Sequence, residues 1–254
     1  MTRVAVVVPV YREPIEKVRK TLASILATPN VTEAILVDDG CNATELDDLI
    51  GERVRVLHLP KNGGCSAALN AGIATLDDED IACRLDVGDH FYPEAKARQI
   101  DVVLSGQARC SSSTHYDPVS GEVWRMPQPW HRRIFTDSVF VPCTNVYRVS
   151  VWREVGGHDE TLRYKADWDF SMIVQFYVGW HMHPEVTCEA GMYPDGFTAQ
   201  ALADPVKRAV REECNRIVSE RARVWGNPDA HAHLFNPKWC RKRGIEPLRR
   251  PEPR

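Results

Sequence analysis

Short apolar runs alternate with helical patterns along the first hundred residues of the chain. The apolar runs are rich in β-branched residues, which is typical of strands buried on both faces of a parallel sheet. They occupy residues 4–9, 33–37, 54–57 and 81–83. Helical spacing and helix-start signals between them predict helices at residues 15–26, from residue 42, at 67–74 and at 93–104. This order predicts an α/β fold with a mostly parallel central sheet, right-handed crossovers and flanking helices on both faces.

The pattern changes after residue 104. Small and polar strand formers come first, and the further elements that we expect are strands at 108–116, 122–126, 139–147 and 181–186 and helices at 149–155, 167–178 and 205–225. The last helix is basic, and the residues after it are rich in Pro, Lys and Arg, which predicts an irregular tail. We therefore divide the chain into a domain at 1–204, with halves at 1–104 and 105–204, and a basic segment at 205–254.

Charge is unevenly distributed along the 254 residues, whose formal net charge is −3. Residues 1–204 carry 19 Lys and Arg against 29 Asp and Glu, whereas residues 205–254 carry 13 against 6. The basic segment predicts contact with an anionic partner such as nucleic acid, and its alternative is a solvated helix face. No apolar run is long enough to span a membrane, and the strand at residues 4–9 leaves no room for a signal peptide. The eight cysteines form no CxxC pair, which favours reduced thiols in the cytoplasm.

Polar or acidic turns follow three of the predicted strands, at residues 11–12, 38–39 and 86–89. The carboxyl ends of parallel strands meet at one edge of a sheet, where open α/β sheets bind ligands. In the third turn, Asp86 and Asp89 lie just past the end of the strand, with Gly88 between them to let the backbone turn. Two carboxylates in this place predict oxygen ligands for a divalent cation, which can in turn hold a diphosphate. The alternative is a polar turn in which Asp86 caps the next helix.

Six motifs occur in an order and spacing that are similar to those of one known family. Their residues are 7–11 (VVPVY), 37–40 (VDDG), 62–72 (NGGCSAALNAG), 85–89 (LDVGD), 152–160 (WREVGGHDE) and 166–170 (ADWDF). Together they resemble the family 2 glycosyltransferases of GT-A fold. The resemblance implies an inverting enzyme that moves a sugar from a nucleotide-diphosphate sugar, with a UDP-sugar favoured, to an acceptor hydroxyl with the help of Mn²⁺ or Mg²⁺. It also makes residues 1–104 the nucleotide-binding half and residues 105–204 the acceptor half.

The resemblance assigns donor-binding roles to residues at the three turns and in the glycine loop. The nucleotide-binding residues that it implies are Pro9, Tyr11, Glu13, Asp39, Gly63 and Asp86. Asp39 would accept a hydrogen bond from the base, because a carboxylate only accepts, and Asp89, together with Asp86, would hold the metal. The residues alone leave other interpretations open: Tyr11 as an aromatic packed over the sheet edge, Asp38 as either a helix cap or a ligand, and the glycine loop as a plain turn.

Asp167 is the general base that the resemblance implies, taking the proton from the acceptor hydroxyl. Asp169 would orient the acceptor site, and the loop with Trp130, Arg132 and Arg133 would contact the acceptor, since Trp suits sugars or bases and Arg suits phosphates. The alternative for both aspartates is capping of the positive end of the helix.

Three positions depart from the family pattern. Gly88 stands where a further Asp is usual, Ala166 stands where Glu is usual, and residues 192–196 contain no His. We therefore expect weak metal binding. Two acceptor classes stay open, namely a saccharide, small molecule or protein, and a hydroxymethylated nucleic-acid base, as for bacteriophage-type sugar transferases. A nucleotidyltransferase and a non-catalytic nucleotide-binding module are the rival hypotheses.

Overall fold

The computed structural model describes residues 2–124, 130–136, 145–191, 193–194 and 196–226. The elements of the first half are β1 (Val4–Val10), α1 (Ile15–Leu26), β2 (Glu33–Asp38), the 3₁₀ helix η1 (Thr44–Leu49), β3 (Val54–His58), α2 (Cys65–Ile73), β4 (Ile81–Arg84), β5 (His90–Phe91) and α3 (Pro93–Leu104). Those of the second half are β6 (Cys110–Asp117), β7 (Glu122–Trp124), α4 (Trp130–Arg133), β8 (Val146–Arg148), α5 (Val149–Val155), α6 (Ala166–Tyr177), β9 (His181–Glu189), α7 (Phe197–Ala203) and α8 (Pro205–Trp225).

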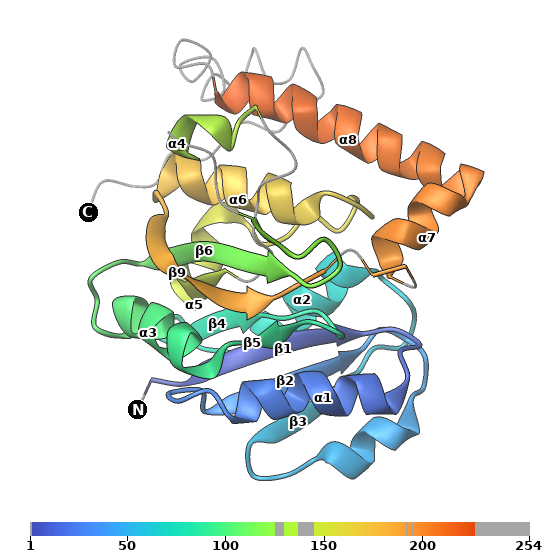
Figure 1. Ribbon diagram of the computed structural model, residues 1–254, viewed down its shortest axis with the longest axis vertical. Helices are drawn as coiled ribbons and strands as arrows, with labels where there is room; N and C mark the ends of the chain where they lie inside the picture. The colour runs from blue at the N-terminus through green and yellow to red at the C-terminus, as the bar shows by residue number, and fades with distance from the viewer. Residues whose placement is uncertain (1, 125–129, 137–144, 192, 195, 227–254) are drawn as a thin grey trace.

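Among the described residues, the strands form one sheet in the order β3-β2-β1-β4-β8-β6-β9-β5, with β7 paired to β6 (Figure 1). The first four strands are parallel, as the alternating pattern predicts. Beyond β4 the sheet is mixed, because β8 runs antiparallel to both β4 and β6, whereas β6 and β9 are parallel. The α/β fold is therefore confirmed, and the sheet is parallel in its first half and mixed in its second.

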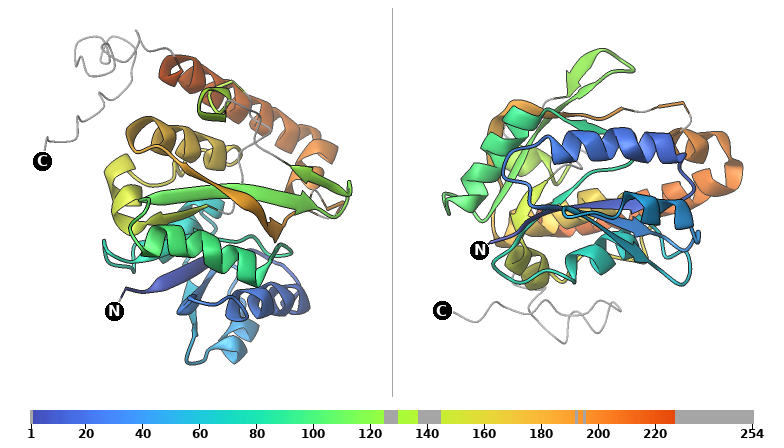
Figure 2. Two further views of the ribbon diagram at one scale, coloured as in Figure 1. Left: turned by 60° about the vertical axis from the view of Figure 1, so that its left-hand side comes forward. Right: turned by 90° about the horizontal axis from the view of Figure 1, so that it is seen from below.

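Helices cover both faces of the sheet, as expected, and bury a separate apolar core on each face (Figure 2). Alternate residues of β1 divide between the cores because strand side chains point to opposite faces. Ala5 and Val7 pack on the side of α2, α5, α6 and α8, whereas Val4, Val6 and Val8 pack on the side of α1 and α3. Nearly every side chain of β1 is thus buried, which explains its continuous apolar sequence.

Helix α8 begins where the sequence predicts it, because Asp204 accepts hydrogen bonds from Val206 N (2.8 Å) and Lys207 N (3.2 Å) and Pro205 occupies the first turn. It lies across α6 (Figure 1) and contributes Cys214 and Val218 to the same core as α2 and α6. Helix α8, which the sequence placed in a separate basic segment, is therefore packed into the core of the preceding domain. In the described ranges, no helix is both long and apolar enough to cross a membrane.

Three details differ from the expected elements. The two-residue strand β5 and helix α7 were not predicted, and β9 extends to Glu189, beyond the expected residues 181–186. The expected strand at 139–147 is described only at its end, as β8, since residues 137–144 lie outside the described part of the chain. Strand β5 is too short to give a sequence signal, and it forms because it pairs with β9.

Candidate active site

The ends of β1, β2 and β4 lie at one edge of the sheet, because these strands are adjacent and parallel. The turns that follow them therefore come together, as the sequence predicts. The Asp39 amide donates to Val10 O (2.9 Å), and the Leu85 amide donates to Val7 O (3.2 Å), so both later turns are tied to β1. This edge brings together the segments that contain Tyr11, Asp39 and Asp86.

The carboxylate of Asp39 holds the glycine loop that precedes α2. Asp39 Oδ1 accepts from Gly63 N (2.7 Å), and Oδ2 accepts from Gly64 N (2.8 Å) and from Asn62 Nδ2 (2.9 Å). Gly64 has a φ of 92°, a left-handed value that favours glycine. Three of the four acceptor positions of the buried carboxylate are thus in use. The sequence did not indicate that Asp39 shapes this loop.

Asp38, the neighbouring carboxylate, binds backbone amides of the turn that leads into η1. Its two oxygens accept from Cys41 N (2.8 Å) and Ala43 N (3.0 Å) at the start of η1, and His58 Nδ1 lies 2.9 Å from Oδ2. Burial raises the pKa of Asp38, but the hydrogen bonds from His58 and the two amides outweigh burial and leave the pKa below its ordinary value. These contacts favour the structural alternative for Asp38 over a role as a ligand.

His58 provides a prediction for the pH dependence of stability. Hydrogen bonds to Asp47 and Asp38 raise the pKa of His58 above its ordinary value. Its ion pairs therefore stabilise the fold fully below the unfolded-state pKa of about 6.5, and this contribution is lost as the pH rises through the folded-state pKa. We expect His58→Gln to lower the free energy of unfolding at pH 5.5 by up to about 1 kcal/mol, since the ring is partly exposed. Urea unfolding at pH 5.5 and pH 9 measures this difference, and a difference that does not shrink at pH 9 contradicts it.

The acidic turn between β4 and β5 is held by a threonine of α1. Thr21 Oγ1 accepts from Gly88 N (2.9 Å) and donates to Asp89 O (3.0 Å), and Gly88 has a φ of 102°. The Asp89 side chain is buried and accepts a hydrogen bond from the Gly191 amide. Burial, and then the nearby charge of Asp86, raise the pKa of Asp89 well above its ordinary value. The turn therefore presents one buried and one partly exposed carboxylate.

These two carboxylates do not by themselves fit a divalent cation site. Arg84 binds both oxygens of Asp86, through Nε (3.2 Å) and Nη2 (2.7 Å). Divalent cations in proteins take about six oxygen ligands, and the part of the chain that the structure describes contains no cluster of three His, Cys, Asp or Glu side chains suited to a metal. The side chain of Lys17 also lies against Gly88, next to Asp89. The metal role that the resemblance implies for Asp89 and Asp86 stays a prediction.

The remaining donor-site residues lie around the turn after β1. Tyr11 is 40% exposed, and the Arg12 guanidinium lies 5.1 Å from the centre of its ring. The Tyr11 amide donates to Glu13 Oε2 (2.5 Å), and burial is the main cause of the raised pKa of Glu13. Pro9, next to the last residue of β1, is the one half-buried residue of this strand. An exposed ring beside a held carboxylate is an arrangement that suits contact with a nucleoside.

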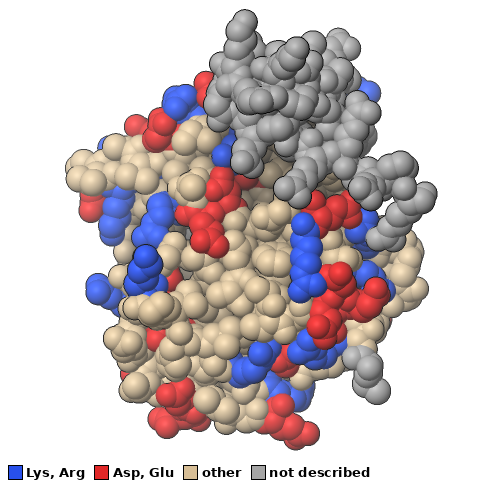
Figure 3. Space-filling model, turned by 180° about the vertical axis from the view of Figure 1, so that it is seen from behind, with Lys and Arg blue, Asp and Glu red and all other residues tan. Residues whose placement is uncertain are grey.

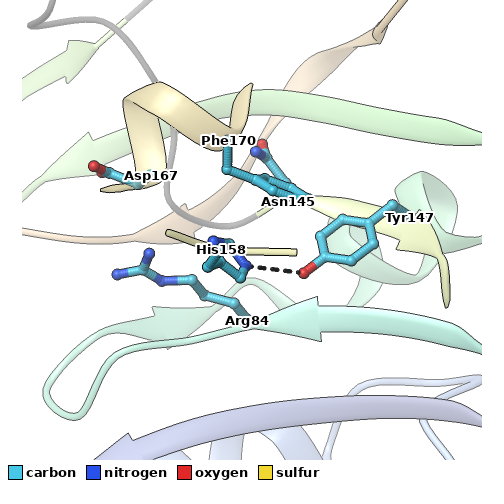
Figure 4. A pocket seen from close by; sticks show the side chains of 6 residues that line it. All are labelled: Arg84, Asn145, Tyr147, His158, Asp167 and Phe170. Atoms are coloured by element: carbon cyan, nitrogen blue, oxygen red, sulfur yellow. Dashed lines mark hydrogen bonds between the residues drawn. The ribbon is translucent and has the colours of Figure 1, made fainter. Parts of the chain in front are cut away.

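Asp167 lies in the first turn of α6 and lines a small pocket with residues from three other segments, namely β4, residues 145–147 and the loop after α5 (Figure 4). The lining residues are Arg84, Asn145, Tyr147, His158, Asp167 and Phe170. Figure 4 shows Arg84 and Asp167 at one end of the pocket and Tyr147 at the other. The structure thus brings the predicted base to the end of β4, the strand that carries the acidic turn. The sequence did not identify Arg84, which joins the acidic turn to this pocket.

His158 lies deep in this pocket and is neutral. Burial, and then the charge of Arg84, lower the pKa of His158 to about 3. Its ring lies 4.2 Å from the ring of Phe170, centre to centre, and its Nε2 lies 3.5 Å from Tyr147 Oη. The backbone of His158 is bound to Asn70 of α2, whose Oδ1 accepts from His158 N (3.0 Å) and whose Nδ2 donates to His158 O (2.9 Å). Asn70 therefore connects α2 to the loop before the predicted base.

Asp169 is buried and bound to α8. It is 2% exposed, and its Oδ1 lies 3.0 Å from Arg221 Nη1 of α8. Arg221 also pairs with Asp159 at 2.8 Å. The side chain at position 169 points from α6 to α8 because it is two residues from Asp167 on a helix, which turns it by about 200°. The assignment of Asp169 to acceptor contact is thus corrected: this carboxylate fixes α8 to the domain.

The expected acceptor loop is described only in part. Arg132 and Arg133 are exposed on α4, whereas the side chain of Trp130 and residues 125–129 lie outside what the structure describes. The loop is joined to α6 because Trp168 Nε1 donates to Ile134 O (2.7 Å). The two arginines are therefore placed near the helix that carries Asp167, and their contact with an acceptor stays a prediction.

Ion pairs neutralise part of the basic surface of α8 that was expected to contact an anionic partner. Arg216 pairs with Glu213 (2.7 Å) and Glu220 (3.3 Å) on the same helix, and Arg221 is bound as described above. Figure 3 shows basic and acidic side chains interspersed on the face that it presents. Lys207, Arg208 and Arg223 of α8 are exposed, and the basic residues at 227–254 lie outside the described residues.

Comparison with known proteins agrees with this arrangement. The family model described as glycosyl transferase family 2 matches residues 5–156, more than half of the chain. Glycosyltransferase GlyG of Streptococcus pneumoniae serotype 4 is 31% identical over 116 residues, which cover 40% of this chain and 38% of that protein. An uncharacterized glycosyltransferase of Rickettsia bellii is 31% identical over 105 residues, covering 39% of this chain and 15% of that protein. The chain thus spans well under two thirds of the length of these relatives.

Two solved structures show a similar fold. S. aureus TarS 1–349 in complex with UDP-GlcNAc matches with a TM-score of 0.63 at 17% identity, covering 78% of this chain and 61% of that one. Mannosyltransferase PcManGT from Pyrobaculum calidifontis, in complex with GDP-Man and Mn²⁺, matches with a TM-score of 0.58 at 14% identity, covering 93% and 75%. These relatives give no support to the bacteriophage-type origin. The fold and the extent of the family match confirm the predicted family, and the chain belongs to glycosyl transferase family 2.

Proposed function

We propose that this protein moves a sugar from a UDP-sugar to an acceptor hydroxyl with inversion at the anomeric carbon. Asp167 takes the proton from the acceptor hydroxyl as its oxygen forms a bond to the anomeric carbon. The bond between that carbon and the diphosphate oxygen breaks, and UDP leaves with the electron pair. Inversion follows because the attack comes from the face opposite the departing diphosphate.

The observation that supports this proposal most is the shared pocket of Asp167 and Arg84. In this proposal the base binds the acceptor, and the acidic turn at the end of β4 binds the donor. The two must therefore lie about the length of one sugar apart. Arg84 lines the pocket and also binds Asp86 through both oxygens. The donor is therefore proposed to lie along the edge formed by Asp39, the glycine loop and the acidic turn, with its sugar directed to Asp167.

Cationic side chains are proposed to stabilise the departing diphosphate. Arg163 Nη2 donates to Asn62 Oδ1 (2.8 Å), and its guanidinium lies directly against Gly64, so a cation stands over the glycine loop. The sequence did not indicate this role for Arg163, because a single Arg in a loop can have many other roles. Preorganised charge of this kind acts strongly where water is excluded.

The base of the donor is proposed to be uracil. Asp39 keeps one acceptor position for a ring N–H, and TarS, a neighbour in fold, has been solved with UDP and with UDP-GlcNAc. The acceptor is proposed to be a saccharide, small molecule or protein hydroxyl. The nucleic-acid alternative relied on the basic C-terminal segment, and within α8 the pairing of Arg216 and Arg221 leaves it less support.

Donor hydrolysis tests the proposal without knowledge of the acceptor. The full chain is incubated with UDP-, GDP- and TDP-sugars, each with Mn²⁺, Mg²⁺ or EDTA, and the released nucleotide is identified by chromatography. We expect slow release of UDP from one UDP-sugar. Formation of UTP and a sugar 1-phosphate when pyrophosphate is added to the UDP-sugar would instead indicate a nucleotidyltransferase. Nucleotide binding, seen as a thermal shift, without any turnover would indicate a non-catalytic module and contradict the proposal.

A further inference from the structure

Position 88, where the chain departs from the pattern of its family, is covered by a lysine of α1. A Cβ atom at Gly88 would lie 2.6 Å from Lys17 Cε and 3.3 Å from Lys17 Nζ. The space that a third acidic side chain would enter is therefore filled by the end of the Lys17 side chain. Gly88 also needs its left-handed φ of 102° to form this turn, so the backbone and the lysine both favour glycine here.

Other groups around Lys17 hold its ammonium group beside the acidic turn. Lys17 is half-buried on α1, and its Nζ lies 5.5 Å from the centre of the Tyr193 ring. Its charge acts favourably on the carboxylates of Glu13 and Asp89. Thr21, one turn further along α1, binds the turn from the same helix, so the lysine and the turn are fixed relative to each other.

We propose that Lys17 supplies a fixed positive charge at the acidic turn, where it takes the place of a divalent cation in holding the donor diphosphate. This inference rests on the proposed function for the identity of the donor. A resident ammonium group can donate hydrogen bonds to diphosphate oxygens, as the lysine of a phosphate-binding loop does. It also repels a divalent cation from Asp89, and this agrees with the absence of a suitable third ligand among the described residues.

The test uses the full chain and three variants. Lys17→Met keeps the length of the side chain and removes its charge, Lys17→Arg keeps the charge, and Lys20→Met removes a charge from an exposed site on the same helix. The first measurement is the binding of Mn²⁺ alone, followed by electron paramagnetic resonance. We expect Lys17→Met to bind Mn²⁺ about tenfold more tightly than wild type, because a like charge next to the carboxylates is removed, and the other two variants to match wild type.

The second measurement is UDP binding in EDTA by calorimetry. Wild type and Lys20→Met are expected to bind UDP, and Lys17→Met is expected to bind about tenfold more weakly, which corresponds to the loss of one charge-assisted contact. Equal Mn²⁺ affinity in Lys17→Met and Lys20→Met would overturn the inference, and so would equal UDP affinity in EDTA. If no nucleotide binds to wild type under any condition, the proposed function fails, and the Mn²⁺ titration still decides whether the Lys17 charge occupies the cation position.

Discussion

Replacing Asp167 by Asn should lower the rate of sugar transfer by about 10²–10⁴-fold, the usual contribution of a general base. The amide has nearly the same size as the carboxylate but cannot take a proton from the acceptor hydroxyl. Donor affinity should change little, because Asp167 lies at the start of α6, whereas the proposed nucleotide site lies at the ends of β1 and β2. Steady-state kinetics of donor hydrolysis, in which water replaces the acceptor, measure the effect before the acceptor is known.

Two comparisons make this result specific. Asp48→Asn, an exposed change on η1, should leave the rate at the wild-type value. The affinity of Asp167→Asn for UDP should also match that of wild type, because the change is confined to the proposed base. A variant that keeps the wild-type rate would show that Asp167 only caps α6, the alternative that the sequence left open.

Replacing Asp39 by Ala should disturb the donor site more broadly than a change at a single contact. The carboxylate holds Asn62, Gly63 and Gly64 through three hydrogen bonds, and bonds to a charged group contribute about 1.5–3 kcal/mol each. The loop amides are half-buried and can bind water once released, so we expect a loss of about 2 kcal/mol in the free energy of unfolding. UDP affinity should fall by about 10- to 100-fold, since the loop no longer has its binding geometry.

Asp39→Asn is the matched variant for this prediction. The amide keeps one acceptor oxygen, but its NH₂ group faces loop amides that also donate, so the variant should lie between Ala and wild type in stability. Urea unfolding and calorimetric titration with UDP measure the two effects. Full UDP affinity in Asp39→Ala would show that the glycine loop takes no part in donor binding, and that the plain-turn interpretation is correct.

The sequence predicted the first half of the fold well because its signals there are local. Strands β1, β2 and β4 are buried on both faces, so their apolar runs are nearly continuous, and the helices between the strands have their own spacing. The second half gives weaker signals: β5 has two residues and β8 is described for three, and their neighbours in the sheet are distant in sequence. Pairing of β8 with β4 and β6 therefore could not be predicted from local pattern.

The sequence by itself determined the order of strands β1 to β4 with the helices between them, the family and the turns that carry the carboxylates. It located Asp39 and Asp86 at strand ends and Asp167 at a helix start. Strand ends and helix starts can be recognised from residues within a few positions of each other. The tertiary structure decided what each of these side chains contacts. Only the folded chain turns Asp169 to Arg221 and brings Lys17 against Gly88, because both contacts join residues more than fifty positions apart, and the direction of a side chain depends on the packing of its helix.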